Sequence, residues 1–270
     1  MRVHWSRTAY LMCAFMKIYL MPLLIFWKYR EMTRLFLGIR SALFYFGYYF
    51  FTIILSIVFI LFFPILPPKG RHVIASIWCG SILVWLRLCC GVKYRIIGIE
   101  NLPTSPAIVI ANHQSSWETI LFYKLIFPVS PILKKELIAI PFWGWSMRLL
   151  KPIAIDRSKP REAGRSLMIQ GVNRIENGNS VIVFPEGSRS KFGTVKRFSR
   201  GGAKLAVAAK TDIVPIAHNA GYCWPARDFI KKPGLITVVI GERIAIADLD
   251  ANQLTAVVES WIRKTLEELN

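Results

Sequence analysis

A histidine and a carboxylate stand five positions apart where a short apolar run ends. His113 and Glu118 belong to the stretch NHQSSWE, which follows the run AIVIA at residues 107–111. On a regular helix, positions five apart point about 140° away from each other, so the two side chains can meet only if His113 precedes the helix and Glu118 lies in its first turn. Ser115 or Ser116 would cap that helix. A carboxylate that accepts the Nδ1 proton leaves Nε2 free as a general base.

A second candidate site follows another apolar run. Residues 181–190 read VIVFPEGSRS, in which a strand is expected to end and a turn to contain Glu186, Gly187, Ser188 and Arg189. Glycine lets a backbone approach a ligand closely, and a hydroxyl beside a guanidinium supplies donors that suit phosphate oxygens. The chain has no G-x-S-x-G elbow and no Walker-type glycine loop, so serine-hydrolase and nucleoside-triphosphatase functions lack their defining motif.

The elements that must position these motifs have the pattern of an α/β domain. From about residue 92, helical stretches alternate with short apolar runs, and we expect strands at 107–111, 129–133, 181–184, 213–217 and 236–241. Pro160 near the start and Gly178 past the end frame one helix. Apolar residues at helical spacing from Leu254 to Leu266 predict an amphipathic C-terminal helix that packs on the sheet. We therefore expect an α/β fold with a mixed sheet flanked by helices.

The N-terminal part of the chain is too apolar for an ordinary cytosolic domain. The chain has 54% hydrophobic residues and a mean hydropathy of +0.41, and residues 41–68 carry no charged side chain. Residues 41–63 could cross a hydrocarbon core of roughly 30 Å as a helix, and a buried core helix of that length would usually show a polar face. The 14-residue stretch 73–86 suits an interfacial or partly inserted helix. We therefore expect a membrane-anchoring helical region, residues 1–95, followed by an α/β domain, residues 96–270.

Residues 1–31 form a further apolar segment, which Lys17 and Pro22 interrupt. No small-residue cleavage site follows it, so a signal peptide is not indicated. If residues 9–27 crossed the membrane, Lys17 would lie near its middle at a cost of roughly 2.5 to 3.5 kcal/mol, and Pro22 would add a kink. We therefore expect an interfacial placement. Met32 could itself be the initiator, in which case this segment is not needed.

The charge of the chain is consistent with an anionic partner. Its 35 Lys and Arg residues outnumber its 16 Asp and Glu residues, which gives a net charge of +19. Basic residues bracket the apolar segments, as expected for contact with lipid headgroups on a cytoplasmic face. Because both flanks are basic, charge does not determine the number of crossings. No recognition module accompanies the charge, so we do not expect a nucleic-acid partner.

The five cysteines indicate neither a metal site nor disulfides. They show no C-x-x-C spacing, and no pair of histidines lies near them in the sequence. Four of the five lie in apolar surroundings, where a free cysteine behaves as a small hydrophobic residue. We therefore expect reduced, structural cysteines.

Four stretches occur in one order along the chain: NHQSSWE, PIAIDRS, VFPEGSRS and IVPIAHNAG. Together they resemble the four sequence motifs of the glycerolipid acyltransferase family, in particular its bacterial 1-acyl-sn-glycerol-3-phosphate acyltransferases. The resemblance extends over roughly residues 35 to 265. Four motifs in order are far more specific than any one of them.

The resemblance implies roles for individual residues. His113 would be the base that deprotonates the glycerol hydroxyl, and Glu118, where the family usually has aspartate, would orient it. Arg157 in the second motif and Arg189 in the third would bind the phosphate of the acceptor. Ser188 stands where threonine is common and keeps the hydroxyl donor.

The fourth motif and its surroundings carry weaker implications. Val214-Pro215-Ile216 corresponds to that motif, and the resemblance implies a strand-end position near the acyl donor. His218, just beyond it, is expected to be a structural histidine at a strand end rather than a second base.

Several site residues have a plain alternative as solvated surface groups. Glu186, Gly187 and Lys135 are expected at the substrate site, yet Lys135 could equally be a solvated charge. Arg157 lies in the charged, loop-like stretch DRSKPRE, so it too could be a surface charge.

The implied activity is transfer of a fatty acyl group from acyl-CoA or acyl carrier protein to the free hydroxyl of lysophosphatidic acid, which gives phosphatidic acid. The implied partners are membrane lipids, lysophosphatidic acid and the acyl donor, with no metal and no bound cofactor. The implied location is a membrane, the inner or plasma membrane in a bacterium, with the catalytic domain in the cytoplasm. Two alternatives remain: an acyltransferase for another lysophospholipid, and a non-catalytic membrane protein that binds anionic lipid.

Overall fold

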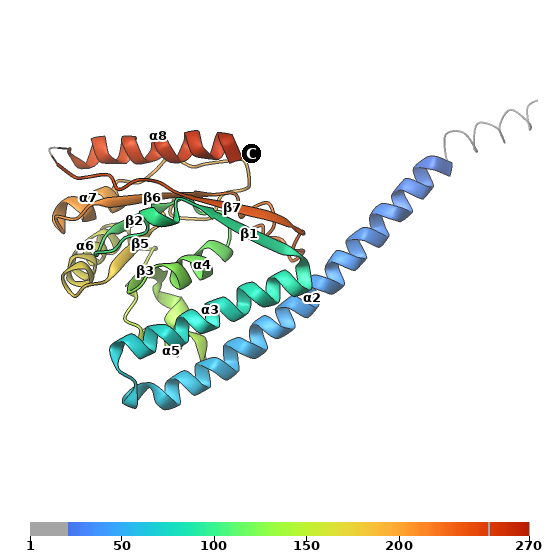
Figure 1. Cartoon of the computed structure of the whole chain (residues 1–270), viewed down its shortest axis with the longest axis horizontal. Coiled ribbons are helices and arrows are strands. Elements are labelled where there is room, and N and C mark those ends of the chain that lie inside the picture. The colour runs from blue at the N-terminus through green and yellow to red at the C-terminus, as the bar shows by residue number, and fades with distance from the viewer. Residues whose placement is uncertain (1–20, 248, 270) are drawn as a thin grey trace, which may run out of the picture.

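The computed structural model describes residues 21–247 and 249–269, and its centre is a seven-stranded sheet with helices on both faces (Figure 1). The strand order is β1-β7-β6-β2-β5-β3-β4, and neighbouring strands are parallel except β6 and β7. The expected α/β fold with a mixed, helix-flanked sheet is therefore confirmed. The strands are β1 (Val92–Ile97), β2 (Ile108–Ala111), β3 (Val129–Lys134), β4 (Ile153–Ile155), β5 (Ser180–Val183), β6 (Ile213–His218) and β7 (Gly234–Ile240).

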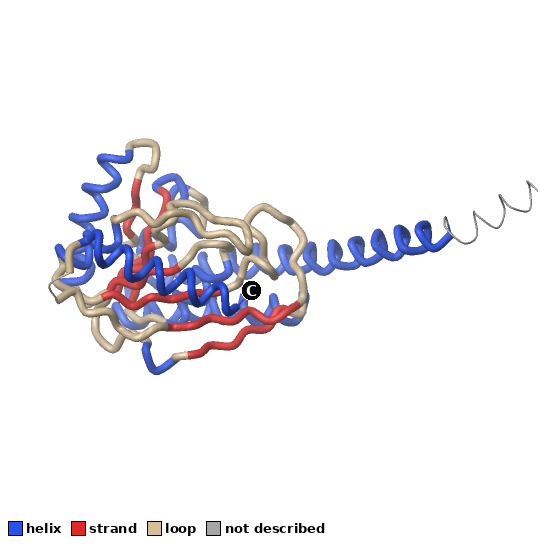
Figure 2. Tube along the Cα trace, turned by 90° about the horizontal axis from the view of Figure 1, so that it is seen from above, coloured by secondary structure: helices blue, strands red, loops and turns tan. Residues whose placement is uncertain are grey.

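The helices form a layer on each face of the sheet (Figures 1 and 2). One layer contains α2 (Met21–Phe62), α3 (Pro68–Cys90), α4 (Trp117–Leu125) and α5 (Trp143–Leu149), and the other contains α6 (Pro160–Glu176), α7 (Gly201–Ala208) and α8 (Ala251–Leu269). Within β2, Val109 and Ala111 belong to one core cluster and Ile108 and Ile110 to the other. Because both faces are covered, β2, β5 and β6 are buried at every residue, which explains their uninterrupted apolar runs.

The helix framed by Pro160 and Gly178 and the C-terminal helix are present, as the sequence predicts. α6 begins at Pro160, and Gly178 follows its end with a φ of 85°. In α8 the buried side chains are Leu254, Val258, Ile262 and Leu266, four residues apart, so the helix covers the sheet with one apolar stripe.

Two strands were not expected from the sequence. β1 lies at the edge of the sheet and exposes most of its side chains, so its sequence lacks a continuous apolar run. β4, at the other edge, has only 3 residues. Because β1 pairs in parallel with β7 from Val92 onward, residues 92–95 belong to the sheet rather than to the helical region in which the expected boundary placed them.

The N-terminal region is a helical hairpin. α2 contains the expected span at residues 41–63 up to Phe62, and a 3-10 turn, η2 (Phe63–Ile65), leads into α3. Two helical segments are long and apolar enough to cross a membrane, Glu31–Ile65 and Gly70–Cys90, with hydropathies of 2.4 and 1.9. α3 has 23 residues, more than the expected 14, because the basic residues that bound the apolar stretch lie in its first and last turns. The predicted interfacial segment lies outside the described residues up to residue 20.

The hairpin packs on the α/β domain near the middle of α2. Ser41 Oγ accepts a hydrogen bond from the backbone N–H of Lys231 (2.8 Å), and the Phe44 ring meets Trp224 edge to face at 5.1 Å. Four of the five cysteines are free and buried, at positions 79, 89, 90 and 223, and Cys13 lies outside the described residues. The hairpin helices and the sheet thus share one core cluster.

Candidate active site

The first three sequence motifs converge where the parallel strands end, at their carboxyl ends. His113 follows β2, Arg157 follows β4 and Glu186 follows β5, while Lys135 follows β3. The carboxyl ends of parallel strands meet at one edge, which is where ligands bind in open α/β sheets. The first three motifs are therefore brought together although up to 76 residues separate them, from His113 to Arg189.

His113 and Glu118 form a hydrogen-bonded pair. His113 Nδ1 lies 2.8 Å from Glu118 Oε1, which also accepts the backbone N–H groups of Gln114 (2.9 Å) and Ser115 (2.7 Å). Glu118 is fully buried, and the side chain of His113 is 14% exposed. The contact requires His113 before α4 and Glu118 in its first turn, which is the arrangement that the spacing predicts.

The cap of α4 is made by the first of the two candidate serines. Ser115 Oγ accepts the backbone N–H of Trp117 (3.1 Å), whereas Ser116, the N-cap residue, makes no side-chain cap hydrogen bond. Glu118 satisfies two further backbone N–H groups at this helix start, so it has a structural role beside its contact with His113.

The electrostatics of the pair define the tautomer of His113. Burial alone would raise the pKa of Glu118, but the hydrogen bonds from His113 and from the Ser115 N–H outweigh it and lower that pKa. An ionised carboxylate only accepts, so Nδ1 of His113 carries the proton and Nε2 is left as the acceptor. The Phe184 ring stacks on the imidazole with centroids 4.2 Å apart and fixes its plane.

Glu118 Oε2 is buried and has no hydrogen-bond partner among the residues that the structure describes. The other oxygen therefore receives all the hydrogen bonds of this carboxylate. A buried charge held on one side only is costly, and such groups are kept where a site uses them.

Glu186 connects the first and third motifs. Its carboxylate accepts the backbone N–H of His113 (2.7 Å), the hydroxyl of Ser190 and the backbone N–H of Lys196 (3.2 Å). The backbone N–H of Ser190 in turn donates to the His113 carbonyl (2.7 Å). Both oxygens of Glu186 are occupied by these contacts, which hold the His113 loop. The expected contact of Glu186 with the substrate stays a prediction.

Three basic side chains lie around the turn of the third motif, and we call them the cation group: Arg157, Arg189 and Lys196. Arg157 Nη1 donates to the Gly187 carbonyl (2.7 Å), Arg189 Nη1 to Ser116 Oγ (2.9 Å) and Lys196 Nζ to Ser188 Oγ (2.5 Å). All three are exposed, and within the described part of the chain none has a carboxylate within ion-pair distance. They are therefore available to an anionic ligand.

Lys196 was not expected from the sequence. It lies in the loop after the third motif, in the stretch SKFGTVKR, whose only signal is its basic character. Lys135 is exposed and near enough to Asp156 to contribute to the lowering of its pKa, for which hydrogen bonds from Ser158 are the main cause. Lys135 thus lies at the same edge, without a contact to the cation group.

Gly187 has a φ of 70°, which favours glycine, and a side chain there would meet no other atom within 4 Å. Glycine thus allows the turn, and the expected close approach to a ligand stays a prediction. No group of three or more His, Cys, Asp and Glu side chains that could hold a metal ion was found in residues 21–247 and 249–269.

The fourth motif lies inside the sheet. Val214, Pro215 and Ile216 are buried in the middle of β6 and pair with β2, so the expected strand-end position is wrong for them. His218 ends the strand, fully buried, and donates from Nε2 to the Asn112 carbonyl (2.8 Å) while Nδ1 accepts the Ala220 N–H (3.3 Å). Burial lowers its pKa, so His218 is a neutral imidazole with both nitrogens in hydrogen bonds, as a structural histidine would be.

Comparison with known proteins places this geometry in a family. The acyltransferase family model matches residues 93–219. A 1-acyl-sn-glycerol-3-phosphate acyltransferase of Pseudomonas aeruginosa is 42% identical over 217 residues, 77% of this chain and 82% of the relative. One from Borreliella burgdorferi is 26% identical over 197 residues, 71% and 77% of the two chains.

A solved structure is also similar over nearly the whole chain. The crystal structure of the 1-acyl-sn-glycerophosphate acyltransferase of Thermotoga maritima superposes with a TM-score of 0.74 and 26% identity, covering 89% of this chain and 97% of the other. Residues 93–219, which match the family model, contain the His113–Glu118 pair, Glu186 and the cation group. The chain is therefore an enzyme that belongs to the acyltransferase family.

Proposed function

We propose that this enzyme transfers a fatty acyl group from an acyl thioester to the free hydroxyl of lysophosphatidic acid and so makes phosphatidic acid. The observation that carries the proposal is the hydrogen-bonded His113–Glu118 pair at the same sheet edge as exposed, unpaired cations. The names of the relatives support this acceptor, because each name gives a 1-acyl-glycerol phosphate as the molecule that is acylated.

The pair supplies the proton transfer. His113 Nε2 takes the proton of the acceptor hydroxyl as its oxygen attacks the thioester carbonyl, and the resulting imidazolium is stabilised by the buried carboxylate of Glu118. The tetrahedral intermediate then collapses, the carbon–sulfur bond breaks, and the departing thiolate takes the proton back from His113. The ester and a free thiol are the products, and no covalent enzyme intermediate is needed.

The cation group supplies the positioning. A phosphate that contacts Arg157 and Arg189 would hold the glycerol hydroxyl in register with His113, which converts a bimolecular encounter into an oriented reaction. Guanidinium groups match phosphate oxygens through two parallel hydrogen bonds. The acyl donor, coenzyme A or acyl carrier protein, is a co-substrate, and the chemistry calls for no metal or bound cofactor.

The hairpin gives the reaction its location. α2 and α3 expose many apolar side chains, among them Phe46, Phe50 and Leu88, so we place these helices in a membrane and the catalytic domain on its cytoplasmic side. A lysophospholipid acceptor dissolved in that membrane would reach the site without entering bulk water.

The test is acyl transfer by the purified full chain in vesicles. We expect phosphatidic acid to form from lysophosphatidic acid with acyl-CoA or acyl carrier protein as donor, and His113→Ala to lower the rate by roughly 10²- to 10⁴-fold while membrane association is retained. Monoacylglycerol and lysophosphatidylcholine distinguish the acceptor alternatives. A folded chain that transfers no acyl group to any of these would support a lipid-binding protein and contradict the proposal.

A further inference from the structure

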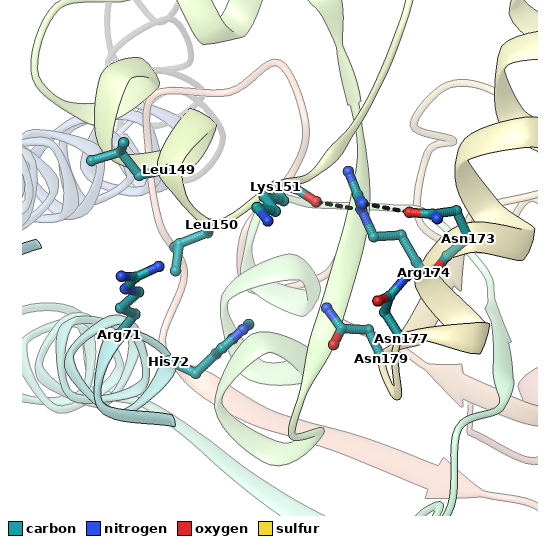
Figure 3. A pocket seen from close by; sticks show the side chains of 9 residues that line it. All are labelled: Arg71, His72, Leu149, Leu150, Lys151, Asn173, Arg174, Asn177 and Asn179. Carbon is teal, nitrogen blue, oxygen red and sulfur yellow. Dashed lines mark hydrogen bonds between the residues drawn. The ribbon is translucent and has the colours of Figure 1, made fainter. Parts of the chain in front are cut away.

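A cavity of about 490 Å³ (Figure 3) lies near the amino ends of the strands. The candidate active site lies at the opposite end of the sheet, at the carboxyl ends of the strands. His113 follows the carboxyl end of β2, whereas Asn179 precedes the amino end of β5, the strand beside it. Roughly the length of a four-residue strand, about 13 Å, therefore separates the two sites at the least. The cavity is lined by the start of α3, the end of α5, the end of α6 and the residue before β5: Arg71, His72, Leu149, Leu150, Lys151, Asn173, Arg174, Asn177 and Asn179.

The charged groups of this cavity are all cations. Arg71, Lys151 and Arg174 line it together with no Asp or Glu, and within the described residues none of the three forms an ion pair. Arg174 is only partly exposed, and burial lowers the pKa of its guanidinium. A partly buried cation without a carboxylate favours an anion as its partner.

The cavity is preformed by hydrogen bonds. Arg174 Nε donates to the Lys151 carbonyl (2.9 Å) and its Nη1 to Asn173 Oδ1 (3.1 Å), the two dashed lines in Figure 3. Lys151 has a φ of 52°, a left-handed conformation that is unfavourable for a lysine and persists only where its surroundings fix it. The guanidinium of Arg174 is thus held in place before any ligand arrives.

Neutral donors complete the lining. Figure 3 shows Arg71 and His72 on one side of the cavity and Asn177 and Asn179 on the other. Asn177 Nδ2 already donates to the Asn173 carbonyl (2.6 Å) and Asn179 Nδ2 to Ser130 Oγ (3.0 Å), which leaves one N–H of each amide for a ligand. Guanidinium groups match the oxygens of a phosphate in particular. A group with several acceptor oxygens and negative charge fits this set of donors on both sides.

Arg71 links the cavity to the apolar tip of the hairpin. Arg71 Nε donates to the Leu66 carbonyl (2.9 Å), and its guanidinium lies over the Phe63 ring at 3.9 Å. Beside this contact Leu61 is 69% exposed and Ile65 is 77% exposed. Proteins bind anionic lipid where apolar side chains can enter the lipid and cations lie beside them at the level of the headgroups.

We propose that this cavity is a second phosphate-binding site, distinct from the site of acyl transfer, and that the phosphate is carried by the headgroup of an anionic phospholipid. Free inorganic phosphate has the same chemistry and is the other source. The inference does not rest on the proposed function, because it concerns binding in the absence of an acyl donor.

The test is calorimetric titration of the purified full chain in a neutral detergent. The ligands are short-chain phosphatidylglycerol, which is neither the proposed acceptor nor the product, and inorganic phosphate. The double variant Lys151→Asn/Arg174→Gln removes two cavity charges, and asparagine tolerates the left-handed conformation of residue 151. The matched control, Arg161→Gln/Arg165→Gln, removes two exposed charges of α6 that do not line the cavity.

We expect phosphatidylglycerol to bind saturably, the cavity variant to bind at least tenfold more weakly, and the control to bind like the wild type. If the wild type binds inorganic phosphate but not phosphatidylglycerol, and the cavity variant binds phosphate at least tenfold more weakly, the site is supported with free phosphate as its ligand. Equal losses in both variants, unchanged binding in the cavity variant, or no saturable binding by the wild type would overturn the proposal. If the double variant unfolds, Lys151→Asn alone, with an exposed side chain, is expected to weaken binding at least threefold.

Discussion

The two halves of the candidate active site are held in different ways. His113 and Glu118 are enclosed: the carboxylate is fully buried, takes three hydrogen bonds on one oxygen, and fixes an imidazole that also stacks on Phe184. The cation group is exposed, and each guanidinium in it makes one contact, Arg157 with Gly187 and Arg189 with Ser116. One half is enclosed by the protein, and the other is open to solvent.

The difference follows from what each half has to do. Proton transfer needs heavy atoms within hydrogen-bond distance and the correct tautomer, so the base must be fixed. Cations that attract a phosphate act over a longer range and remain hydrated until the ligand replaces the water. A substitution in the enclosed half should therefore change the chemical step, and one in the exposed half should change the use of the acceptor.

The largest effect is expected for Glu118→Gln. The amide keeps the size of the side chain but loses the charge that stabilises the imidazolium of His113, so kcat should fall by about 10²-fold or more. Glu118→Asp keeps the charge and shortens the reach by one methylene, and its loss should be smaller. The measurement is steady-state acyl transfer, with thermal unfolding in parallel because Glu118 also holds the start of α4. A larger loss in Glu118→Asp than in Glu118→Gln would show that the reach of the side chain, rather than its charge, matters.

A smaller effect is expected for Arg189→Lys in the exposed half. A point charge cannot reproduce a two-point contact with phosphate, so kcat/KM for the acceptor should fall by about tenfold, mostly through KM. Arg165→Lys, an exposed arginine of α6, is the matched control and should leave the kinetics unchanged. Acceptor kinetics that are unaltered in Arg189→Lys would make Arg189 a surface charge and remove it from the phosphate site.

The enclosed half was predictable from the sequence, and much of the exposed half was not. His113 and Glu118 are neighbours in sequence, so a strand end and a helix start are enough to bring them together. The contact of Glu186 with the His113 backbone joins residues 73 positions apart, and only the strand order of the sheet creates it. Lys196 reaches the site through a loop with no periodic pattern, so no spacing could predict it.

Parts of the fold also differ in how well the sequence predicts them. The central strands β2, β5 and β6 are covered on both faces, so their apolar runs identified them. β1 and β4 lie at the edges, where a half-exposed or very short strand leaves no clear pattern. The antiparallel pairing of β7 with β6 depends on the path of the chain after residue 218, and nothing in either strand's composition specifies its direction.

The buried cation Lys231 tests whether enclosing a charge lowers the stability of the folded protein. Lys231 is fully buried and donates to the carbonyls of Asp228 (2.6 Å) and Phe229 (3.0 Å), and burial lowers its pKa to about 8. The unfolded chain keeps this proton up to about pH 10.4, so it binds more protons than the folded chain between the two values. The stability of the wild type should therefore rise with pH across that window relative to Lys231→Met.

The measurement for Lys231 is the difference in melting temperature between the wild type and the variant from pH 7.5 to 10. Lys232→Met is the matched control, since Lys232 is exposed, and it should show no such trend. The difference in melting temperature should change by a few degrees over this pH range. One group with a shifted pKa changes the free energy of unfolding by a few kcal/mol at most in a domain of this size. A difference that stays constant with pH would mean that Lys231 keeps an ordinary pKa in the folded protein.

The smallest effect is expected from removing the first 31 residues. A chain that starts at Met32 keeps both apolar helical segments and the contacts that join α2 to the domain, including Ser41 with Lys231 and Phe44 with Trp224. It also keeps both halves of the active site, so it should remain bound to membranes and transfer acyl groups at the rate of the full chain. Fractionation and an acyl-transfer assay of the two chains side by side check this expectation. If the shorter chain were soluble, the first 31 residues would be an anchor that the hairpin cannot replace; if it were bound but inactive, they would help to position the exposed half of the site.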